Sequence, residues 1–180
     1  APNSLASTLQ TGPGASHTKS LIRYLKEFEF EKPLGDHAKN QRIIYEPKGV
    51  CALITPWNWP INQVTLKVIP ALASGCTMIL KPSELAPLSA MIIAELIDEA
   101  KFPKGVFNLV NGDGEITGDA LTSHPDVNMI SFTGSTRAGA LISQNAAKDF
   151  KRVSLELGGK GANIIFEDAD AEAIERGAFR

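Results

Sequence analysis

From residue 49 onward, short apolar runs alternate with longer segments in which apolar residues recur every three or four positions. The short runs have no polar face and are typical of buried strands; they occupy residues 49–55, 77–80, 106–110 and 129–132. The longer segments predict helices at residues 61–74, 87–100, 116–122 and 138–147. Strands that are apolar on both sides need cover on both sides. The order therefore predicts an α/β fold, with a Rossmann-like parallel sheet covered by helices on both faces.

The same periodicity predicts which residues each helix buries. In the segment 61–74, Pro70 is an expected kink and the apolar face comprises Ile61, Val64, Val68 and Leu72. In the segment 87–100, which Pro87 opens, the predicted buried stripe comprises Leu88, Ile92 and Leu96. Both stripes should face the sheet.

The first 48 residues follow a different pattern. Residues 1–16 are small and polar and are expected to form a loop, whereas apolar residues at helical spacing predict an amphipathic helix at residues 18–28. Two strand-like pieces follow at residues 29–32 and 42–46, separated by turn-forming residues. This ribbon could be a simple hairpin or an arm for a neighbouring subunit, and the sequence leaves both interpretations open.

Composition and charge exclude several classes of function. The 180 residues include 18 basic and 20 acidic side chains and no basic run, which argues against a nucleic-acid partner. Three scattered histidines and two cysteines offer neither metal-ligand spacing nor a disulfide framework, so we expect no metal and a reducing, cytoplasmic location. No signal peptide or membrane-spanning run is visible. The chain begins without methionine and stops inside a helical pattern, so we expect it to be a piece of a longer protein.

Polar residues follow the predicted strands, and in parallel sheets the ligand crevice lies beyond the carboxyl ends of the strands. After residues 129–132, Gly134 would let a ligand approach the backbone. Ser135 or Thr136 can cap the next helix, whose free N–H groups form an anion site. The turn lacks the G-x-G-x-x-G spacing, so a plain strand-to-helix turn is the alternative.

A second polar cluster follows residues 77–80. The Glu84 carboxylate can accept hydrogen bonds from two adjacent ribose hydroxyls, and Lys81 can approach the same sugar. The alternative is a solvated salt bridge in a loop.

Asn58 is a candidate oxyanion donor. It stands between Trp57 and Trp59 in a loop that two prolines stiffen, so its amide should have a fixed direction towards developing negative charge. The alternative is a buried aromatic loop in which Asn58 satisfies backbone carbonyls.

Glu156 is a candidate general base. It ends an apolar strand and precedes Gly158 and Gly159, an environment that would favour its protonated form and let its side chain move. The alternative is a buried structural carboxylate bonded to backbone amides.

Five motifs carry a resemblance to a known family. They are Ile54-Thr55-Pro56-Trp57-Asn58-Trp59-Pro60, Leu80-Lys81-Pro82-Ser83-Glu84, Pro87-Leu88-Ser89-Ala90, Phe132-Thr133-Gly134-Ser135-Thr136 and Leu155-Glu156-Leu157-Gly158-Gly159-Lys160. In this order and spacing the chain resembles the aldehyde dehydrogenase superfamily over nearly its whole length. The resemblance implies an oxidoreductase that converts an aldehyde to a carboxylic acid with NAD(P)⁺, through a cysteine thiohemiacetal and thioester.

The resemblance also implies a division of the chain and a set of roles. Residues 1–48 would be a helix and an oligomerisation-type ribbon, 49–159 a dinucleotide-binding domain, and 160–180 the start of a catalytic domain. Asn58 resembles the oxyanion donor and Glu156 the base that activates the deacylating water. The implied cofactor contacts are Lys81 and Glu84 for the adenine ribose, Trp57 and Ser135 for the pyrophosphate, Leu157 near the nicotinamide, and Ile54, Thr55, Pro56, Ser83, Gly114, Phe132 and Gly134 around them.

The resemblance places the nucleophilic cysteine beyond Arg180. Cys51 and Cys76 do not match it and are expected to be small core residues. NAD is favoured over NADP because the Glu84 charge would repel a 2′-phosphate, although Lys81 could counter that repulsion. The implied partners are a small aldehyde and further copies of the chain, in a dimer or tetramer.

Two other classes stay open at this point. One is a non-catalytic nucleotide-binding or structural relative, against which the intact Asn58 and Glu156 argue. The other is a different Rossmann-type reductase, against which the missing G-x-G-x-x-G argues.

Overall fold

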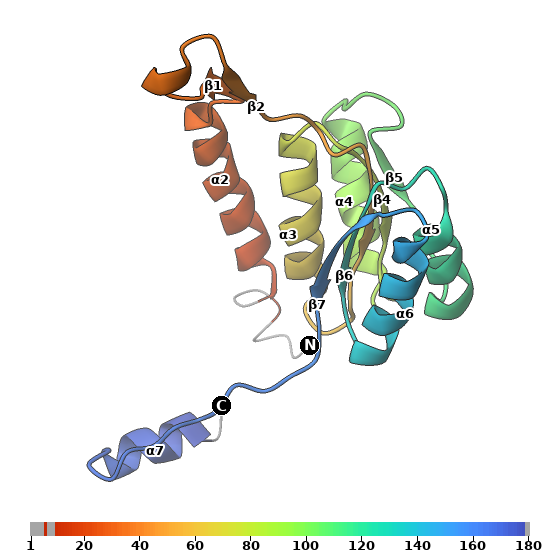
Figure 1. Ribbon diagram of the computed structural model, residues 1–180. Helices are drawn as coiled ribbons and strands as arrows, with labels where there is room; N and C mark the ends of the chain where they lie inside the picture. Colours follow the sequence, from red (N-terminus) through yellow and green to blue (C-terminus); the bar gives the residue numbers. More distant parts are fainter. Residues whose placement is uncertain (1–5, 7–9, 179–180) are drawn as a thin grey trace.

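A five-stranded parallel sheet forms the centre of the protein, in a computed structural model that describes residue 6 and residues 10–178 (Figure 1). Its strands are β3 (Val50–Ile54), β4 (Thr77–Lys81), β5 (Phe107–Leu109), β6 (Met129–Thr133) and β7 (Arg152–Glu156). They lie in the order β5-β4-β3-β6-β7, and every neighbouring pair is parallel. The fold class predicted from the alternation of apolar runs and helices is confirmed.

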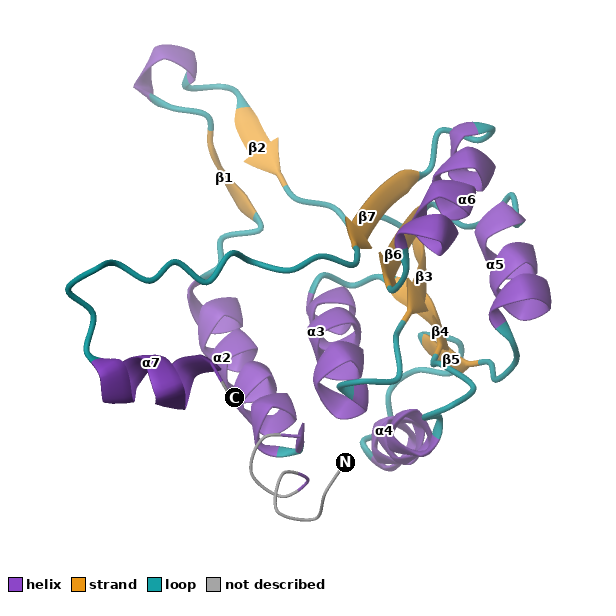
Figure 2. Ribbon diagram, turned by 90° about the horizontal axis from the view of Figure 1, so that it is seen from below, coloured by secondary structure: helices purple, strands orange, loops and turns teal. Residues whose placement is uncertain are grey.

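Helices cover both faces of this sheet. Figures 1 and 2 show α3 (Pro60–Ala73) and α4 (Leu88–Glu99) on one side, with α5 (Asp119–Ser123) and α6 (Thr136–Ala147) on the other. A single π-helical turn, η3 (Gly114–Gly118), leads directly into α5. The chain therefore forms three layers, with the sheet in the middle.

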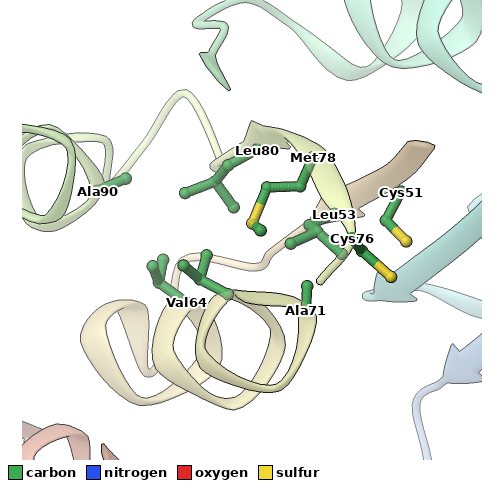
Figure 3. Packing of buried hydrophobic residues seen from close by; sticks show 9 residues of the cluster. Cys51, Leu53, Val64, Ala71, Cys76, Met78, Leu80 and Ala90 are labelled. Atoms are coloured by element: carbon green, nitrogen blue, oxygen red, sulfur yellow. The ribbon is translucent and has the colours of Figure 1, made fainter. Parts of the chain in front are cut away.

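Alternation along β3 divides the core in two. Cys51 and Leu53 point to the first cluster, which Figure 3 shows packed against α3 and β4 through Val64, Ala71, Cys76, Met78 and Leu80. Ala52 and Ile54 point to the other face and pack with Val127, Ile130, Phe132, Ile142 and Ala146. Both cysteines are free and buried, as expected for small core residues.

The predicted helix faces have different outcomes. In α3, Val64 and Val68 are buried and Leu72 packs against them, as the periodicity indicated. The predicted stripe of α4 is wrong, because Leu88 is 70% exposed, Ile92 55% and Leu96 52%. The helix instead turns Ala90, Ile93 and Ile97 to the sheet. Apolar residues occupy most of its circumference, so spacing alone could not select the buried face.

The N-terminal segment forms one long helix and a hairpin. Helix α2 runs over Gly12–Glu27, so residues 12–16 are helical rather than a loop; residues 1–5 and 7–9 of that prediction lie outside the described residues. It packs on α3, where His17 Nε2 and Asn62 Oδ1 are 2.9 Å apart. Strands β1 (Glu31–Pro33) and β2 (Arg42–Ile44) pair antiparallel, with a 3₁₀ turn, η2 (Asp36–Ala38), between them. The ribbon is a hairpin, and its proposed use as an arm stays a prediction.

After β7 the chain leaves the sheet. Residues 157–170 contain no helix or strand, and α7 (Ala171–Ala178) lies apart from the three layers (Figure 1). Within the part of the chain that is described, no helix is long and apolar enough to cross a membrane.

Candidate functional site

The carboxyl edge of the sheet gathers the polar residues that the sequence singled out. Strands β3, β4 and β5 succeed one another outwards, and the chain then returns to place β6 beside β3. The connections after β3 and β6 therefore leave in opposite directions and open a crevice at the carboxyl ends of these two strands. Two cavities lie there, and Ser135, which immediately precedes α6, lines both of them.

The larger cavity has a volume of about 800 Å³. The loop after β3 contributes one wall, α3 a second, and the segment after β7 a third. Its lining includes the predicted residues Pro56, Trp57, Asn58, Gly134, Ser135, Glu156 and Leu157, together with Gln63, Lys67, Ser131, Thr133, Ser154 and Lys160. Groups predicted separately as oxyanion donor, anion-binding turn and general base thus share one cavity.

Asn58 and Trp57 belong to an open loop. Trp57 is 62% exposed and Asn58 is exposed, so the indoles do not enclose the amide as expected. The loop precedes Pro60, the first residue of α3, which has a fixed φ suited to a helix start. Asn58 therefore lines the cavity from a loop that connects the end of β3 to the start of α3.

Glu156 is exposed at the end of the edge strand β7, which corrects the prediction of a carboxylate surrounded by apolar side chains. Strand β7 pairs only with β6, so exposed and half-buried residues alternate along it. The Glu156 backbone carbonyl accepts a hydrogen bond from the Gly134 N–H at 3.0 Å. This bond places the Glu156 carboxylate and the turn before α6 on the same cavity.

Lys67 is a residue of the larger cavity that the sequence reasoning missed. Its Nζ donates to Ser131 Oγ at 2.8 Å, across the gap between α3 and β6. Burial lowers the pKa of the Lys67 ammonium to about 8, and the nearby Glu156 carboxylate partly offsets that effect. A signal was available, because Lys67 is the only charged residue in the helix that begins at Pro60.

The N-terminus of α6 can hold an anion. Ser135 caps the helix, with its hydroxyl accepting a hydrogen bond from the Ala138 N–H at 3.2 Å. Of the two caps left open by the sequence, Ser135 is therefore the one used. A Cβ on Gly134 would collide with the Phe132 ring, so a larger residue would have to displace that ring where the strand turns into the helix. Backbone N–H groups of the first turn remain available to a ligand.

The smaller cavity has a volume of about 340 Å³ and is flanked by two walls. One wall belongs to β3, β6 and α6 and is largely apolar; the other belongs to η3 and α5. The predicted residues that line it are Ile54, Lys81, Gly114, Phe132 and Ser135, and it also includes Glu115, Arg137, Ala138, Leu141, Ile142 and Asn145. A small cavity with a largely apolar wall suits a ring system.

Lys81 occupies the inner end of the smaller cavity. Its side chain is 3% exposed, and Nζ donates to the Pro82 carbonyl at 3.0 Å and lies 3.6 Å from Glu84 Oε2. The ion pair is thus anchored in the core at one end and is not the solvated loop pair of the alternative interpretation. The Ser83 hydroxyl accepts from the Leu85 N–H at 3.3 Å and shapes this turn.

Thr55 is buried directly after β3. Its N–H donates to the Lys81 carbonyl at 3.2 Å, which extends the β3–β4 pairing. Its hydroxyl and that of Thr133 are buried and have no hydrogen-bond partner among the described residues. Unpaired hydroxyls at both strand ends are unusual in a folded protein.

Polar bridges hold the two walls of the smaller cavity together. Asn145 Nδ2 on α6 donates to Asp119 Oδ1 at 2.8 Å and to Thr122 Oγ1 at 3.2 Å, both on α5. The buried Lys151 Nζ donates to the carbonyls of Thr122 at 3.0 Å and His124 at 2.7 Å. Helix α5 is thereby fastened to α6 and to the start of β7.

A doubly wound sheet whose switch point carries two cavities, joined at a capped helix N-terminus, has the architecture of a nucleotide-binding α/β protein. The chain belongs to the aldehyde dehydrogenase family, whose pattern matches residues 5–180. The resemblance read from the five motifs is confirmed.

Individual relatives are similar along almost the entire chain. A 3-succinoylsemialdehyde-pyridine dehydrogenase from a Pseudomonas species is 56% identical over 174 residues, which are 96% of this chain and 36% of that relative. The crystal structure of an aldehyde dehydrogenase from Bartonella henselae matches with a TM-score of 0.94 and 60% identity over 98% of this chain and 37% of that one. An aldehyde dehydrogenase C mutant from Pseudomonas syringae, in complex with NAD⁺ and octanal, matches with a TM-score of 0.91 and 52% identity, over 97% of this chain and 35% of that one. The chain therefore spans just over a third of the length of these relatives.

Proposed function

We propose that this chain supplies the cofactor site and part of the catalytic apparatus of an NAD-dependent aldehyde dehydrogenase, which oxidises an aldehyde to a carboxylic acid. One observation carries the proposal: Asn58, Ser135 and Glu156, which come from three separate motifs, line a single cavity at the switch point of the sheet. Family membership and the NAD⁺ complex of the Pseudomonas syringae relative support it.

The residues present fit a dinucleotide. The apolar slot of the smaller cavity suits an adenine, and Lys81 and Glu84 lie beside it for a ribose. Ser135 and the first turn of α6 offer N–H groups for a pyrophosphate between the two cavities. Thr133, whose buried hydroxyl has no partner among the described residues, lines the larger cavity, where the other half of the ligand would lie. When bound, NAD⁺ would accept the hydride that the aldehyde loses.

Asn58 serves as an oxyanion donor in this proposal. Its amide N–H would stabilise the negative charge that develops on the aldehyde oxygen once a nucleophile adds to the carbonyl carbon. Because the amide is neutral, it would favour the charged transition state without also holding a carboxylate product as an ion pair.

Glu156 serves as the general base. Its carboxylate would take a proton from a water molecule whose oxygen attacks the carbonyl carbon of the thioester; the carbon–sulfur bond then breaks, which releases the carboxylic acid and the cysteine thiolate. Lys67 lies near this carboxylate, whose negative charge partly offsets the lowering of the Lys67 pKa by burial. Exposure of Glu156 gives water a direct path to it.

The nucleophile of the proposed reaction is a cysteine that this chain does not supply. Cys51 and Cys76 lie near the amino ends of β3 and β4, whereas both cavities lie at the carboxyl ends. Burial also raises the pKa of the Cys51 thiol to about 12, which keeps it un-ionised and unreactive. The chain by itself is therefore proposed to be inactive, with the nucleophile on sequence beyond Arg180.

The same proposal covers the organisation of the protein. Residues 1–48 would act as a helix and oligomerisation arm, 49–159 as the cofactor domain, and 160–180 as the entry to a catalytic domain. The exposed aromatic side chains Phe28, Phe30 and Tyr45, which contact one another where α2 meets the hairpin, are available to a second copy in a dimer or tetramer. A cytoplasmic location is part of the proposal.

Calorimetry of NAD binding tests the proposal first. The intact polypeptide that carries this chain should bind NAD, and Glu84→Ala should weaken that binding. Aldehyde-dependent formation of NADH by the same polypeptide would distinguish an enzyme from a non-catalytic relative that only binds nucleotide. Cofactor-dependent aldehyde oxidation by the 180-residue chain alone would refute the placement of the nucleophile.

A further inference from the structure

Both cations that line the smaller cavity are paired with a carboxylate. Lys81 Nζ lies 3.6 Å from Glu84 Oε2, and Arg137 Nη2 lies 3.6 Å from Glu115 Oε1. Within the described part of the chain, the lining of this cavity contains no other lysine or arginine. Each of the two cations that line this cavity therefore already has a carboxylate partner that balances its charge.

The two pairs differ in mobility. Lys81 is buried and also donates to the Pro82 carbonyl, so it is held in place. Arg137 and Glu115 have side chains that are 84% and 89% exposed, and they stand on opposite walls of the cavity, in the first turn of α6 and in η3. An exposed pair of this length contributes little stability, so Arg137 can leave Glu115 when another anion competes.

We propose that Glu115 is a specificity-determining residue, which holds Arg137 and so prevents the cavity from accepting a dinucleotide with a phosphate on its adenosine ribose. The inference rests on the proposed function, because it concerns the same cofactor site. A phosphate dianion binds best where a guanidinium offers two parallel N–H groups. With Glu115 present, that guanidinium is engaged and a further negative charge stands at the mouth of the cavity.

The proposed effect of Glu115 on cofactor specificity is distinct from that of Glu84. Glu84 acts next to a lysine that cannot move, whereas Glu115 controls an arginine that can. Removal of the Glu115 charge should therefore release a mobile cation while it leaves the Lys81–Glu84 pair intact. Removal of Arg137 should abolish the gain.

Binding calorimetry on the intact polypeptide separates these effects. The probes are NAD, NADP and the shorter pair 5′-AMP and adenosine 2′,5′-bisphosphate, which report on the adenosine end alone. The variants are Glu115→Gln, Arg137→Gln and the double variant. Glu172→Gln is the matched control, because it breaks an equally exposed ion pair with Arg176, 3.4 Å long, on α7 away from the cavity.

Glu115→Gln should tighten the binding of NADP and of the bisphosphate by about tenfold, the scale of one charge-assisted hydrogen bond. Binding of NAD and 5′-AMP should change by less than about twofold, and the gain should shrink at high salt because the groups are exposed. The double variant and Glu172→Gln should show no gain. Melting temperatures should be unchanged, since all four side chains lie at the surface.

Two results would overturn the inference in distinguishable ways. If the unchanged protein binds NAD but Glu115→Gln leaves the NADP-to-NAD affinity ratio as it was, Glu115 does not determine specificity and the proposed function stands. If the unchanged protein binds neither NAD nor 5′-AMP, the proposed function fails and this inference fails with it.

Discussion

The Nζ of Lys67 donates a hydrogen bond to the Oγ of Ser131 over 2.8 Å, which joins α3 to strand β6 beside the larger cavity. This bond keeps a cation in a half-buried position next to Glu156, and the burial lowers the pKa of Lys67 to about 8 from the ordinary 10.5.

The lowered pKa predicts a pH dependence of stability. Between about pH 8 and 10.5 the unfolded chain retains a proton on Lys67 that the folded chain has released. Burial of the charged Lys67 side chain destabilises the folded protein, and this destabilisation is fully present below pH 8. It should disappear as the pH rises across this window, so the free energy of unfolding should increase. Urea unfolding of the parent protein and Lys67→Met at several pH values measures the difference. Parallel curves would contradict the assignment, and the exposed Lys148→Met serves as a control.

The catalytic assignments predict separate losses of activity in the intact polypeptide. Asn58→Ala should lower kcat by about 10²–10³-fold, the usual effect of removing one oxyanion donor. Glu156→Gln should lower turnover by about 10²–10⁴-fold, because the amide cannot take a proton from water. An initial burst of NADH without steady turnover in Glu156→Gln would place its role after hydride transfer. Unchanged turnover in either variant would exclude that residue.

Lys151 predicts an effect on stability through the bonds that fasten α5 to the start of β7. Its buried ammonium donates to the Thr122 and His124 carbonyls and lies 3.2 Å from Asp149 Oδ2. Lys151→Met should lower the free energy of unfolding by about 2 kcal/mol, because its charge-assisted bonds to the Thr122 and His124 carbonyls and its ion pair with Asp149 are lost, although the His124 carbonyl keeps the Val127 N–H. Chemical denaturation measures the change. If Lys148→Met, at the exposed C-cap of α6, destabilised as much, the bonds would not be the cause.

The turn before α6 predicts that glycine is required at position 134. A Cβ there would lie within 3.0 Å of Phe132 Cε2, whereas a Cβ on Gly159 would meet nothing within 4 Å. Gly134→Ala should destabilise by about 1–3 kcal/mol as the Phe132 ring is displaced, and it should weaken NAD binding. Gly159→Ala should leave both properties nearly unchanged. Equal effects of the two substitutions would rule out the steric argument.

The sequence predicts the buried face of a helix correctly only where apolar and polar residues fall on opposite faces of that helix. Helix α3 has one apolar face, and Val64 and Val68 were placed correctly. Helix α4 is apolar nearly all round, so Leu88 and Ile92 were assigned to the wrong face. Periodicity identifies a buried face only when the opposite face is polar.

The site was predictable to the extent that its residues sit at strand ends. Asn58, Lys81, Ser135 and Glu156 follow strands of a parallel sheet, and topology brings such positions to one edge. Arg137 and Glu115 meet across the cavity although 22 positions separate them in the sequence, and no local pattern marks the contact. The exposure of Glu156 could not be predicted from the sequence either. It follows from the position of β7 at the edge of the sheet, which the residues of β7 do not reveal.

Among the residues that the structure describes, Ser135 alone lines both cavities, and its position has a consequence for any ligand. A molecule that fills both spaces must pass this side chain, so one ligand would contact Ser135 at the junction of its two halves. Two separate fragments, one for each cavity, could instead bind together and be joined by a short flexible tether over the hydroxyl, which offers a direct route to inhibitors that do not imitate a nucleotide.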